Sequence, residues 1–419
     1  MIVLIRAAKV VDPNSKYHNK VVDILIKNGI IQEIGKNIKA PKVGEIIEEK
    51  GLHVSPGLFD LHANFRDPGF EWKEDMQSGM LAAAKGGFTG VLSMPSTLPA
   101  TDTKSQVEYI QNMSAGNVVN VYPAGSITKD LKGQELTEMF DMSRSGALAF
   151  TDDKNSIQHA DLMKLALLYT KNFGGIIMNQ ANDKIISKDG HMNEGITSTV
   201  LGMKGIPSLA EELMIARDIK LAEYTEGRLH FSCISTEKSV ELIRAAKKQG
   251  LNITADVAIY NLVLDETACE GFDTRYKVNP ALRTQKDIKA LLKGLKDGTI
   301  DAICTDHIPE DIEHKKVEFD NAEFGMIGLQ TAFSLACQLE KEIGLEGVIE
   351  KMAINPRKLL GLEVPEINIE KAANLCLFNS TTEWTLEETN IVSKSKNTPF
   401  IGKTLKGKII GVVNNGKLG

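Results

Sequence analysis

The feature that most constrains the fold of this chain is the alternation of short apolar segments with amphipathic segments along its middle part. The apolar segments have the length and composition of buried parallel strands, and the segments between them repeat apolar residues at helical spacing. The strand candidates are HVSPGLFDLH, TGVLSMP, VVNVYPAG, ALAFTDD, GIIMNQ, RLHFSC, NITADV and IDAICTD. The helix candidates include MQSGMLAAAKG, LMKLALLYTKNF, SLAEELMIARDIKLAEYT, KSVELIRAAKKQG and KDIKALLKGLKDG. Seven of these strands follow from the pattern alone, and eight strands alternating with helices predict a (β/α)8 barrel of the TIM type.

The two ends of the chain have a different pattern. Residues 2 to about 50 and the segment from about residue 374 contain short apolar or alternating runs separated by turn signals. A chain of 419 residues is also longer than one hydrophobic core usually supports. We therefore predict a barrel domain over 51–373 and a small β-sandwich domain built from 1–50 and 374–419.

Charge and apolar runs exclude several classes of function. The net charge of −6 argues against nucleic acid or an anionic membrane as the main partner. The opening MIVLIRAAKVVDPN is too short and too interrupted for a signal peptide or a membrane span, and no later segment reaches spanning length. The five cysteines are scattered without a CxxC pair. Reduced cysteines in a cytoplasmic protein are the expectation.

Polar residues end the first strand of the predicted barrel, in the stretch SPGLFDLHANFRDPG. Asp60, His62, Asn64 and Arg66 follow one another at every second position. Alternate side chains of an extended chain share one face, so these four are expected to point together. A titratable row at the end of a buried strand is costly unless it binds something, and barrel enzymes place their active sites at this end of the strands.

This stretch resembles the opening strand of the metal-dependent amidohydrolases, and most closely that of the dihydroorotases. Their pattern is Asp-x-His-x-His-x-Arg, in which two histidines bind a zinc pair and the arginine binds a substrate carboxylate. The segment GGFTGVLSMPSTLP resembles the family's second-strand signature. Further counterparts follow in order, namely AFTDDK, MNEG, RDIKLAE, STEKSVELIR, VNPALR, DGTIDAICTDHIP, FGMIGLQT and SKSKNTPFIGKTLKGK. The resemblance covers essentially the whole chain and supports the count of eight strands.

The resemblance implies a set of metal ligands, of which three are altered here. The ligand positions are occupied by His62, Asn64, Asp153, Gln180, Cys233 and Asp306, and the last of these is also the general base. Asn64, Gln180 and Cys233 stand where the family has histidine. Carboxamides are weak zinc donors, and a soft thiolate does not reproduce the usual pair. Zinc is therefore expected at partial occupancy at most, with His62, Asp153, Cys233 and Asp306 as the residual candidate ligands.

The resemblance also implies substrate-binding residues. Arg66 keeps the arginine position, and a guanidinium suits a bidentate clamp on a carboxylate. Asn279 in VNPALR and His307 keep positions that the resemblance assigns to substrate binding. Ser96 stands where the family has an asparagine beside the substrate carboxylate.

Two of these residues, and the lysine that follows Asp153, leave open alternatives. Cys233 is either a buried small apolar residue or a ligand. Without a metal, Asp306 is expected to cap a loop or to pair with Arg66. Relatives in the wider superfamily carry a carboxylated lysine on the fourth strand, but the resemblance assigns that position to Asp153. Lys154 is therefore expected to be solvated.

Two hypotheses of function follow. The first is a dihydroorotase-like protein of pyrimidine biosynthesis that is weakly active or non-catalytic, because its metal site is partly lost. The resemblance implies for such members a partner role with aspartate carbamoyltransferase. The second is an active cyclic amidohydrolase that interconverts dihydroorotate and N-carbamoyl-aspartate at a rebuilt mononuclear zinc site. Relatives tend to pair, so a homodimer is expected in either case.

Overall fold

The computed structural model describes all residues from 1 to 419, and its larger part is a closed parallel barrel. The barrel strands follow one another in sequence order, β6-β7-β8-β9-β10-β13-β14-β15. Their bounds are β6 Leu58–Ala63, β7 Phe88–Ser93, β8 Asn120–Gly125, β9 Ala149–Phe150, β10 Ile177–Asn179, β13 Leu229–Phe231, β14 Ile253–Ala258 and β15 Ala302–Cys304. Each of the eight strand candidates overlaps one of these strands, and no strand extends more than one residue beyond its candidate. The predicted (β/α)8 barrel is confirmed.

The last strand closes the barrel against the first. The backbone amide of Asn64 donates to the carbonyl of His307 over 2.9 Å, and the amide of His307 donates to the carbonyl of His62 over 3.2 Å. One step deeper, the Asp60 carboxylate accepts hydrogen bonds from the amide and the hydroxyl of Thr305, at 2.8 and 2.5 Å. The site residues of β6 and those that follow β15 are therefore held side by side.

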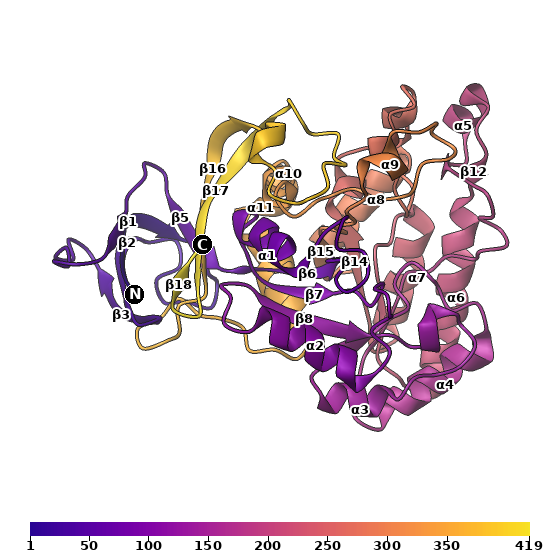
Figure 1. Cartoon of the computed structure of the whole chain (residues 1–419), viewed down its shortest axis with the longest axis horizontal. Coiled ribbons are helices and arrows are strands. Elements are labelled where there is room, and N and C mark those ends of the chain that lie inside the picture. Colours follow the sequence, from indigo (N-terminus) through magenta and orange to yellow (C-terminus); the bar gives the residue numbers. More distant parts are fainter.

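Helices cover the outside of the barrel (Figure 1). The longer ones are α1 Met76–Lys85, α2 Lys104–Ser114, α4 Ala160–Lys171, α6 Ser208–Thr225, α7 Glu237–Lys248, α8 Gln285–Lys296 and α11 Glu340–Ile349. The shorter ones are α3 Met139–Arg144, α5 Ile196–Leu201, α9 Ile312–Lys315, α10 Ala332–Cys337 and α12 Asn355–Leu359. Several begin at a residue whose side chain caps the first turn, as Thr236 does for α7 and Thr284 for α8.

A second sheet joins the two ends of the chain. Its order is β18-β17-β16-β5-β1-β2-β3, with β4 beside β1. The bounds are β1 Ile2–Val10, β2 Val21–Lys27, β3 Ile30–Gly35, β4 Glu45–Ile47, β5 His53–Pro56, β16 Leu375–Thr385, β17 Thr404–Asn414 and β18 Lys417–Leu418. β16 pairs antiparallel with β5, so the indigo and yellow ends of the chain lie together beside the barrel (Figure 1). The small β domain predicted from both termini is thus present.

Two further features complete the fold. A two-stranded sheet, β11 Met192–Asn193 and β12 Gly205–Ile206, lies in the loop before α6 and was not predicted from the sequence. None of the helices combines the length and the apolar character that crossing a bilayer requires.

Candidate functional site

The carboxyl ends of the barrel strands bring the four candidate metal ligands together. His62 lies near the end of β6, while Asp153, Cys233 and Asp306 follow β9, β13 and β15. His62 Nε2 lies 2.7 Å from Asp153 Oδ1 and 3.3 Å from Asp306 Oδ1. Ligand atoms of His62, Cys233 and Asp306 all lie within 4.8 Å of one another. All four side chains are buried, so the cluster is a polar centre enclosed by the strand ends.

Strained backbone conformations occur at residues that follow the same strands. Arg66, Asp153, Cys233 and Asp306 have φ angles of 60°, 53°, 53° and 47°. Non-glycine residues rarely adopt this left-handed conformation, which costs about 1–3 kcal/mol each and is found most often at functional sites. The chain leaves these strands in a conformation that aims polar side chains into the barrel mouth.

The Asp153 carboxylate is held by three side chains. Its Oδ1 faces His62, and its Oδ2 accepts hydrogen bonds from Asn64 Nδ2 at 3.2 Å and from Ser96 Oγ at 2.6 Å. Burial alone raises the pKa of Asp153, but the neighbouring His62 and Lys154 outweigh it and hold the pKa below its ordinary value. The hydroxyl of Ser96, expected at the substrate, is thus engaged by a site carboxylate.

Asp306 is paired with Lys154. Lys154 Nζ lies 2.7 Å from Asp306 Oδ1 and 2.8 Å from the carbonyl oxygen of Asn279. The Tyr260 hydroxyl donates to Asp306 Oδ2. The prediction that Lys154 is solvated was wrong, because its side chain is only 22% exposed and reaches into the cluster. The alternative in which Asp306 pairs with Arg66 was also wrong.

These pairs fix the protonation of the groups around Asp306. Burial disfavours the charged form of Lys154, but the adjacent Asp306 carboxylate raises the pKa of Lys154 above its ordinary value. Burial and the same carboxylate raise the pKa of Tyr260 well above its ordinary value, so Tyr260 keeps its proton and donates it. Burial likewise disfavours a charged His62, but Cys233 and Asp306 raise its pKa well above the ordinary value. Both oxygens of Asp306 therefore already accept from donors of the chain, which leaves it poorly placed to take a proton from a substrate.

Asn64 and Gln180, the two carboxamides at ligand positions, are used differently. Asn64 donates to Asp153, but its Oδ1 makes no hydrogen bond within the chain, and the same holds for the buried Gln180 Oε1. Gln180 lines a cavity of about 10 Å³ together with Cys233 and Asn279. That volume is about the size of one water molecule. The structure thus brings Gln180 and Asn279 to the same side of the cluster.

Cys233 approaches His62 from the opposite edge of the imidazole. Its Sγ lies 3.8 Å from His62 Nδ1 and 3.6 Å from Cys304 Sγ, whereas the carboxylates face Nε2. Its amide donates to Asp256 Oδ1 over 2.6 Å. The sequence did not point to Cys304, because a single cysteine inside an apolar strand carries no signal.

Arg66 does not reach the cluster but binds a carboxylate of the chain itself. Its guanidinium donates to Glu310 Oε1 over 2.6 Å, and Lys73 Nζ lies 2.5 Å from Glu310 Oε2. The three side chains are 13%, 12% and 5% exposed for Arg66, Lys73 and Glu310. Sequence reasoning missed Glu310, although it follows the TDHIP segment directly. A carboxylate of the protein thus sits where the resemblance assigned a carboxylate of the substrate.

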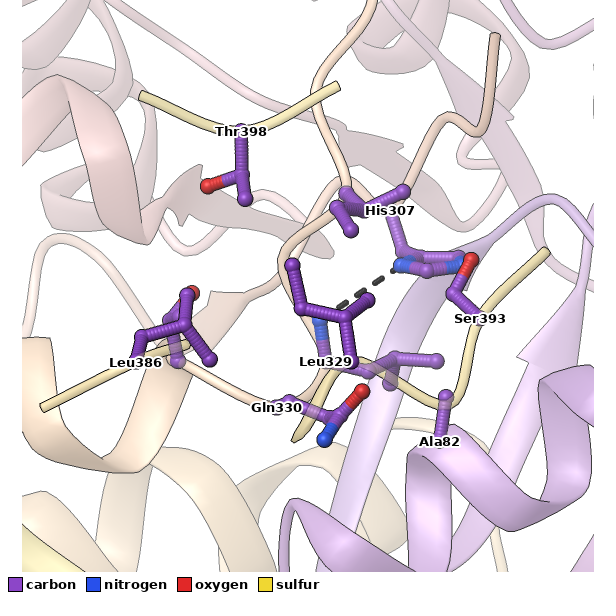
Figure 2. A pocket seen from close by; sticks show the side chains of 10 residues that line it. Ala82, His307, Leu329, Gln330, Leu386, Ser393 and Thr398 are labelled. Carbon is purple, nitrogen blue, oxygen red and sulfur yellow. Dashed lines mark hydrogen bonds between the residues drawn. The ribbon is translucent and has the colours of Figure 1, made fainter. Parts of the chain in front are cut away.

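His307 lies in a small cavity between the barrel and the segment 386–398 (Figure 2). Its Nδ1 accepts hydrogen bonds from the amides of Gly328 and Leu329 at 3.1 and 3.5 Å. Its Nε2 lies 3.5 Å from Glu74 Oε2. Nδ1 is thus hydrogen-bonded, whereas the buried Nε2 makes no hydrogen bond and faces the Glu74 carboxylate. Neither nitrogen contacts Asp306 or the side chains that bind it.

The resemblance implied a zinc pair, and the donors can be compared with that requirement. Zinc sites use imidazole, thiolate and carboxylate donors in a tetrahedral arrangement. This cluster contains a single imidazole, whose two nitrogens face different donors, and the ammonium of Lys154 lies on one carboxylate. One imidazole, one thiol and two carboxylates are too few donors to complete two tetrahedral sites, so the donor set does not fit two zinc ions.

Known proteins resemble this chain over its whole length. Residues 51–239 match the family model described as Dihydro-orotase-like. A dihydroorotase of Acetivibrio thermocellus is 44% identical over 419 residues, covering 99% of this chain and 98% of its own. A dihydroorotase of Geobacter metallireducens is 42% identical over 421 residues, covering 100% and 99%.

Solved structures share the fold at low identity. An L-hydantoinase (dihydropyrimidinase) from Arthrobacter aurescens superposes with a TM-score of 0.84 at 21% identity, covering 100% of this chain and 96% of its own. A dihydropyrimidinase from Brevibacillus agri superposes with a TM-score of 0.82 at 21% identity, covering 100% and 95%. With the full-length sequence matches, this likeness leads to one conclusion: the chain belongs to the dihydroorotase family of the amidohydrolase superfamily.

Proposed function

We propose that this chain is a dihydroorotase-family protein of pyrimidine biosynthesis in the cytoplasm whose site has lost the zinc pair and whose catalysis is weak or absent. The observation that carries the proposal is the pairing of Arg66 with Glu310. The Nε and Nη2 edge of the guanidinium is engaged, because Nη2 donates to Glu310 and Nε donates to the carbonyl of Pro309. Glu310 also repels an anion that approaches Arg66. The altered ligand positions Asn64, Gln180 and Cys233 act in the same direction.

Turnover and metal content test this proposal together. The protein is purified without chelator, and the rates of dihydroorotate hydrolysis and of N-carbamoyl-aspartate cyclisation are measured beside those of the Acetivibrio thermocellus relative. We expect kcat/KM to be at least about 10³-fold lower, since metal activation of water and carbonyl supplies several kcal/mol. Rates within tenfold of the relative would contradict the proposal.

A variant of Glu310 tests the carboxylate exchange. In Glu310→Gln the charge that competes for Arg66 is removed, and N-carbamoyl-aspartate is expected to bind at least about tenfold more tightly by calorimetry. Asp311→Asn is the matched control, because Asp311 is the adjacent acid and contacts Trp72 and His314 rather than Arg66. Equal affinities in the wild type and Glu310→Gln would show that Arg66 is available without the substitution.

A second candidate is an active enzyme with one zinc ion on His62, Asp153, Cys233 and Asp306. It is favoured by the distance of at most 4.8 Å between donor atoms of His62, Cys233 and Asp306. Asp306 would be the catalytic base, with Asn279 and Arg66 holding a dihydroorotate-like substrate. Stoichiometric zinc in the purified protein, with turnover abolished in Asp306→Ala, would establish this candidate over the first.

The partner role forms part of the first proposal. We infer a homodimer that associates with aspartate carbamoyltransferase, and the surface of α4 and α6 supports an interface. These neighbouring helices expose Leu165, Leu168, Leu209 and Leu213 at 39–49% of their surface. Exposed apolar groups gathered on adjacent elements are typical of interaction surfaces.

Light scattering tests the interface. Leu168→Glu combined with Leu213→Glu is expected to lower the molar mass of the protein alone, or to abolish its co-elution with aspartate carbamoyltransferase. Leu81→Glu is the control, because Leu81 is 47% exposed on α1. An unchanged mass and unchanged co-elution in the double variant would place any interface elsewhere.

A further inference from the structure

Lys154 occupies an unusual place for a lysine. It follows Asp153 in the segment after β9, and its ammonium lies 2.7 Å from Asp306 Oδ1. The same Oδ1 lies 3.3 Å from His62 Nε2, which itself contacts Asp153. The ammonium, the imidazole and the two carboxylates therefore form one continuous network. Lys154 contributes the ammonium of this network.

Two anchors hold the ammonium in this position. Besides Asp306, Lys154 Nζ donates to the carbonyl oxygen of Asn279 over 2.8 Å, in the segment between β14 and α8. The strained backbone of Asp153, with φ of 53°, lets successive residues 153 and 154 both contribute side chains to the cluster. The contact thus links the ends of β9 and β15 to the segment between β14 and α8 and is not a chance contact of a long surface side chain.

The contact between the Lys154 ammonium and Asp306 supplies the positive charge that a metal ion would supply. Two buried carboxylates within reach of one imidazole need positive charge nearby, because unpaired buried charge is strongly destabilising. A metal cation would supply that charge, but so does an ammonium at hydrogen-bonding distance. An ammonium has three N–H donors and no vacant coordination position, so it neutralises a carboxylate without activating a water molecule as a zinc ion does.

We propose that the Lys154 ammonium is a built-in cation that takes the place of the metal at Asp306, so that the folded site is complete and stable without zinc. The proposal deepens the proposed function, on which it rests, because it names the group that replaces the cofactor. It also explains why Asp306 and Asp153 are kept in a site whose histidine positions are altered: the two carboxylates now anchor Lys154 and His62 across the barrel mouth.

The test compares thermal unfolding with and without zinc. In Lys154→Met the cation is lost and Asp306 is left with fewer donors, so the melting temperature in chelator is expected to fall by about 3–6 °C. Added zinc is expected to restore at least half of that loss in Lys154→Met while leaving the wild type unchanged. Lys184→Met is the matched control, since Lys184 is an exposed lysine above the neighbouring strand that contacts Asn155.

A second pair of variants keeps the test decisive if Lys154→Met unfolds. Lys154→Arg keeps a cation and is expected to melt within 2 °C of the wild type, whereas Asp306→Asn combined with Lys154→Met removes both charges and is expected to regain part of the loss. The zinc content of the wild type after dialysis against zinc is an independent readout. We expect fewer than about 0.1 zinc ion per chain.

Three results would overturn the proposal: stoichiometric zinc in the wild type, a Lys154→Met protein as stable in chelator as Lys184→Met, or strict additivity of the Lys154 and Asp306 substitutions. The proposed function has a different point of failure. If the wild type turns over dihydroorotate while remaining free of metal, weak catalysis is refuted and the role of Lys154 stands. If the wild type binds zinc and is inactive, the role of Lys154 is refuted and weak catalysis stands.

Discussion

Two halves of the strand-end site differ in how their polar atoms are used. The carboxylate half, which consists of His62, Asp153, Lys154 and Asp306, is fully engaged: every carboxylate oxygen accepts from a side chain of the protein. The amide half, which consists of Asn64 and Gln180, holds two buried oxygens without a hydrogen bond in the chain.

This difference between the halves follows from the free-energy cost of leaving each kind of buried group unpaired. A carboxylate left without a positive or donating neighbour costs several kcal/mol, so Asp153 and Asp306 are surrounded by donors. An unpaired amide oxygen costs only about 1–3 kcal/mol, which a barrel of this size tolerates. Substitutions in the carboxylate half are therefore expected to cost more stability than substitutions in the amide half.

The largest effect is expected in the carboxylate half. Asp153→Ala removes the partner of His62, Asn64 and Ser96 at once and is expected to lower the free energy of unfolding by about 3–5 kcal/mol. Urea unfolding measures this loss. Asp161→Ala on the exposed side of α4 is the control and is expected to stay within about 0.5 kcal/mol of the wild type. Similar decreases in the free energy of unfolding in both variants would mean that the contacts of Asp153 stabilise the protein no more than a surface carboxylate does.

A pH effect is expected from Asp60, directly beneath the carboxylate half. Burial raises the pKa of Asp60 to about 7, although its hydrogen bonds with Thr305 partly oppose the shift. The folded state therefore holds a proton that the unfolded state, with a pKa near 3.8, releases. Its stabilising contribution is complete below pH 4 and is lost as pH rises through about 7.

The variant Asp60→Asn isolates this term, because the amide resembles the protonated acid and does not titrate. The stability of the wild type relative to Asp60→Asn is expected to fall by about 2–4 kcal/mol between pH 4 and pH 8. Unfolding curves of both proteins across this range measure the difference. If the stability of the wild type relative to Asp60→Asn stays constant or increases as pH rises, Asp60 is already ionised in the folded protein at pH 4, which contradicts the prediction.

A smaller effect is expected at Ser96, which links the second strand to the carboxylate half. Ser96→Ala removes one charge-assisted hydrogen bond of 2.6 Å to Asp153 at a partly exposed position. We expect a loss of about 1 kcal/mol, since the carboxylate keeps two other partners. Ser96→Thr, which keeps the hydroxyl, is the control, and equal losses in the two variants would point to packing rather than to the hydrogen bond.

The smallest effect, with the opposite sign, is expected in the amide half. Gln180→Met removes an unsatisfied buried oxygen at nearly constant volume and is expected to change stability by between 0 and about 1 kcal/mol in the stabilising direction. Asn179→Leu is the contrast at the preceding residue, because Asn179 donates to Asp218 over 2.8 Å and its loss is expected to destabilise. A decrease of more than about 2 kcal/mol in the free energy of unfolding of Gln180→Met would show that the side chain of Gln180 stabilises the fold.

Much of the fold could be predicted from local pattern. Each apolar segment of the middle region overlaps a barrel strand, because a strand buried on both faces is largely apolar. The short β11–β12 sheet was missed, since two residues per strand leave no periodicity to detect. The predicted boundaries at residues 50 and 374 stay predictions, and β5, which pairs with β16, already lies beyond the first of them.

The site was predictable in its members but not in its pairings. The resemblance to the dihydroorotases identified His62, Asp153, Cys233 and Asp306, and the structure brings them together. It missed Lys154 and Glu310 as partners, because the reach of a long side chain depends on where the neighbouring strand ends lie. Arg66 was expected on a substrate and is found on Glu310.

The sequence by itself determined the barrel, the small β domain and the family, because periodicity and ordered motifs are properties of the chain taken locally. Only the tertiary structure decided which charges meet. Lys154 and Asp306 are 152 residues apart, and Arg66 and Glu310 are 244 apart. Closure of the barrel places them within hydrogen-bonding distance, and the low polarity of its interior makes those contacts strong enough to define the site.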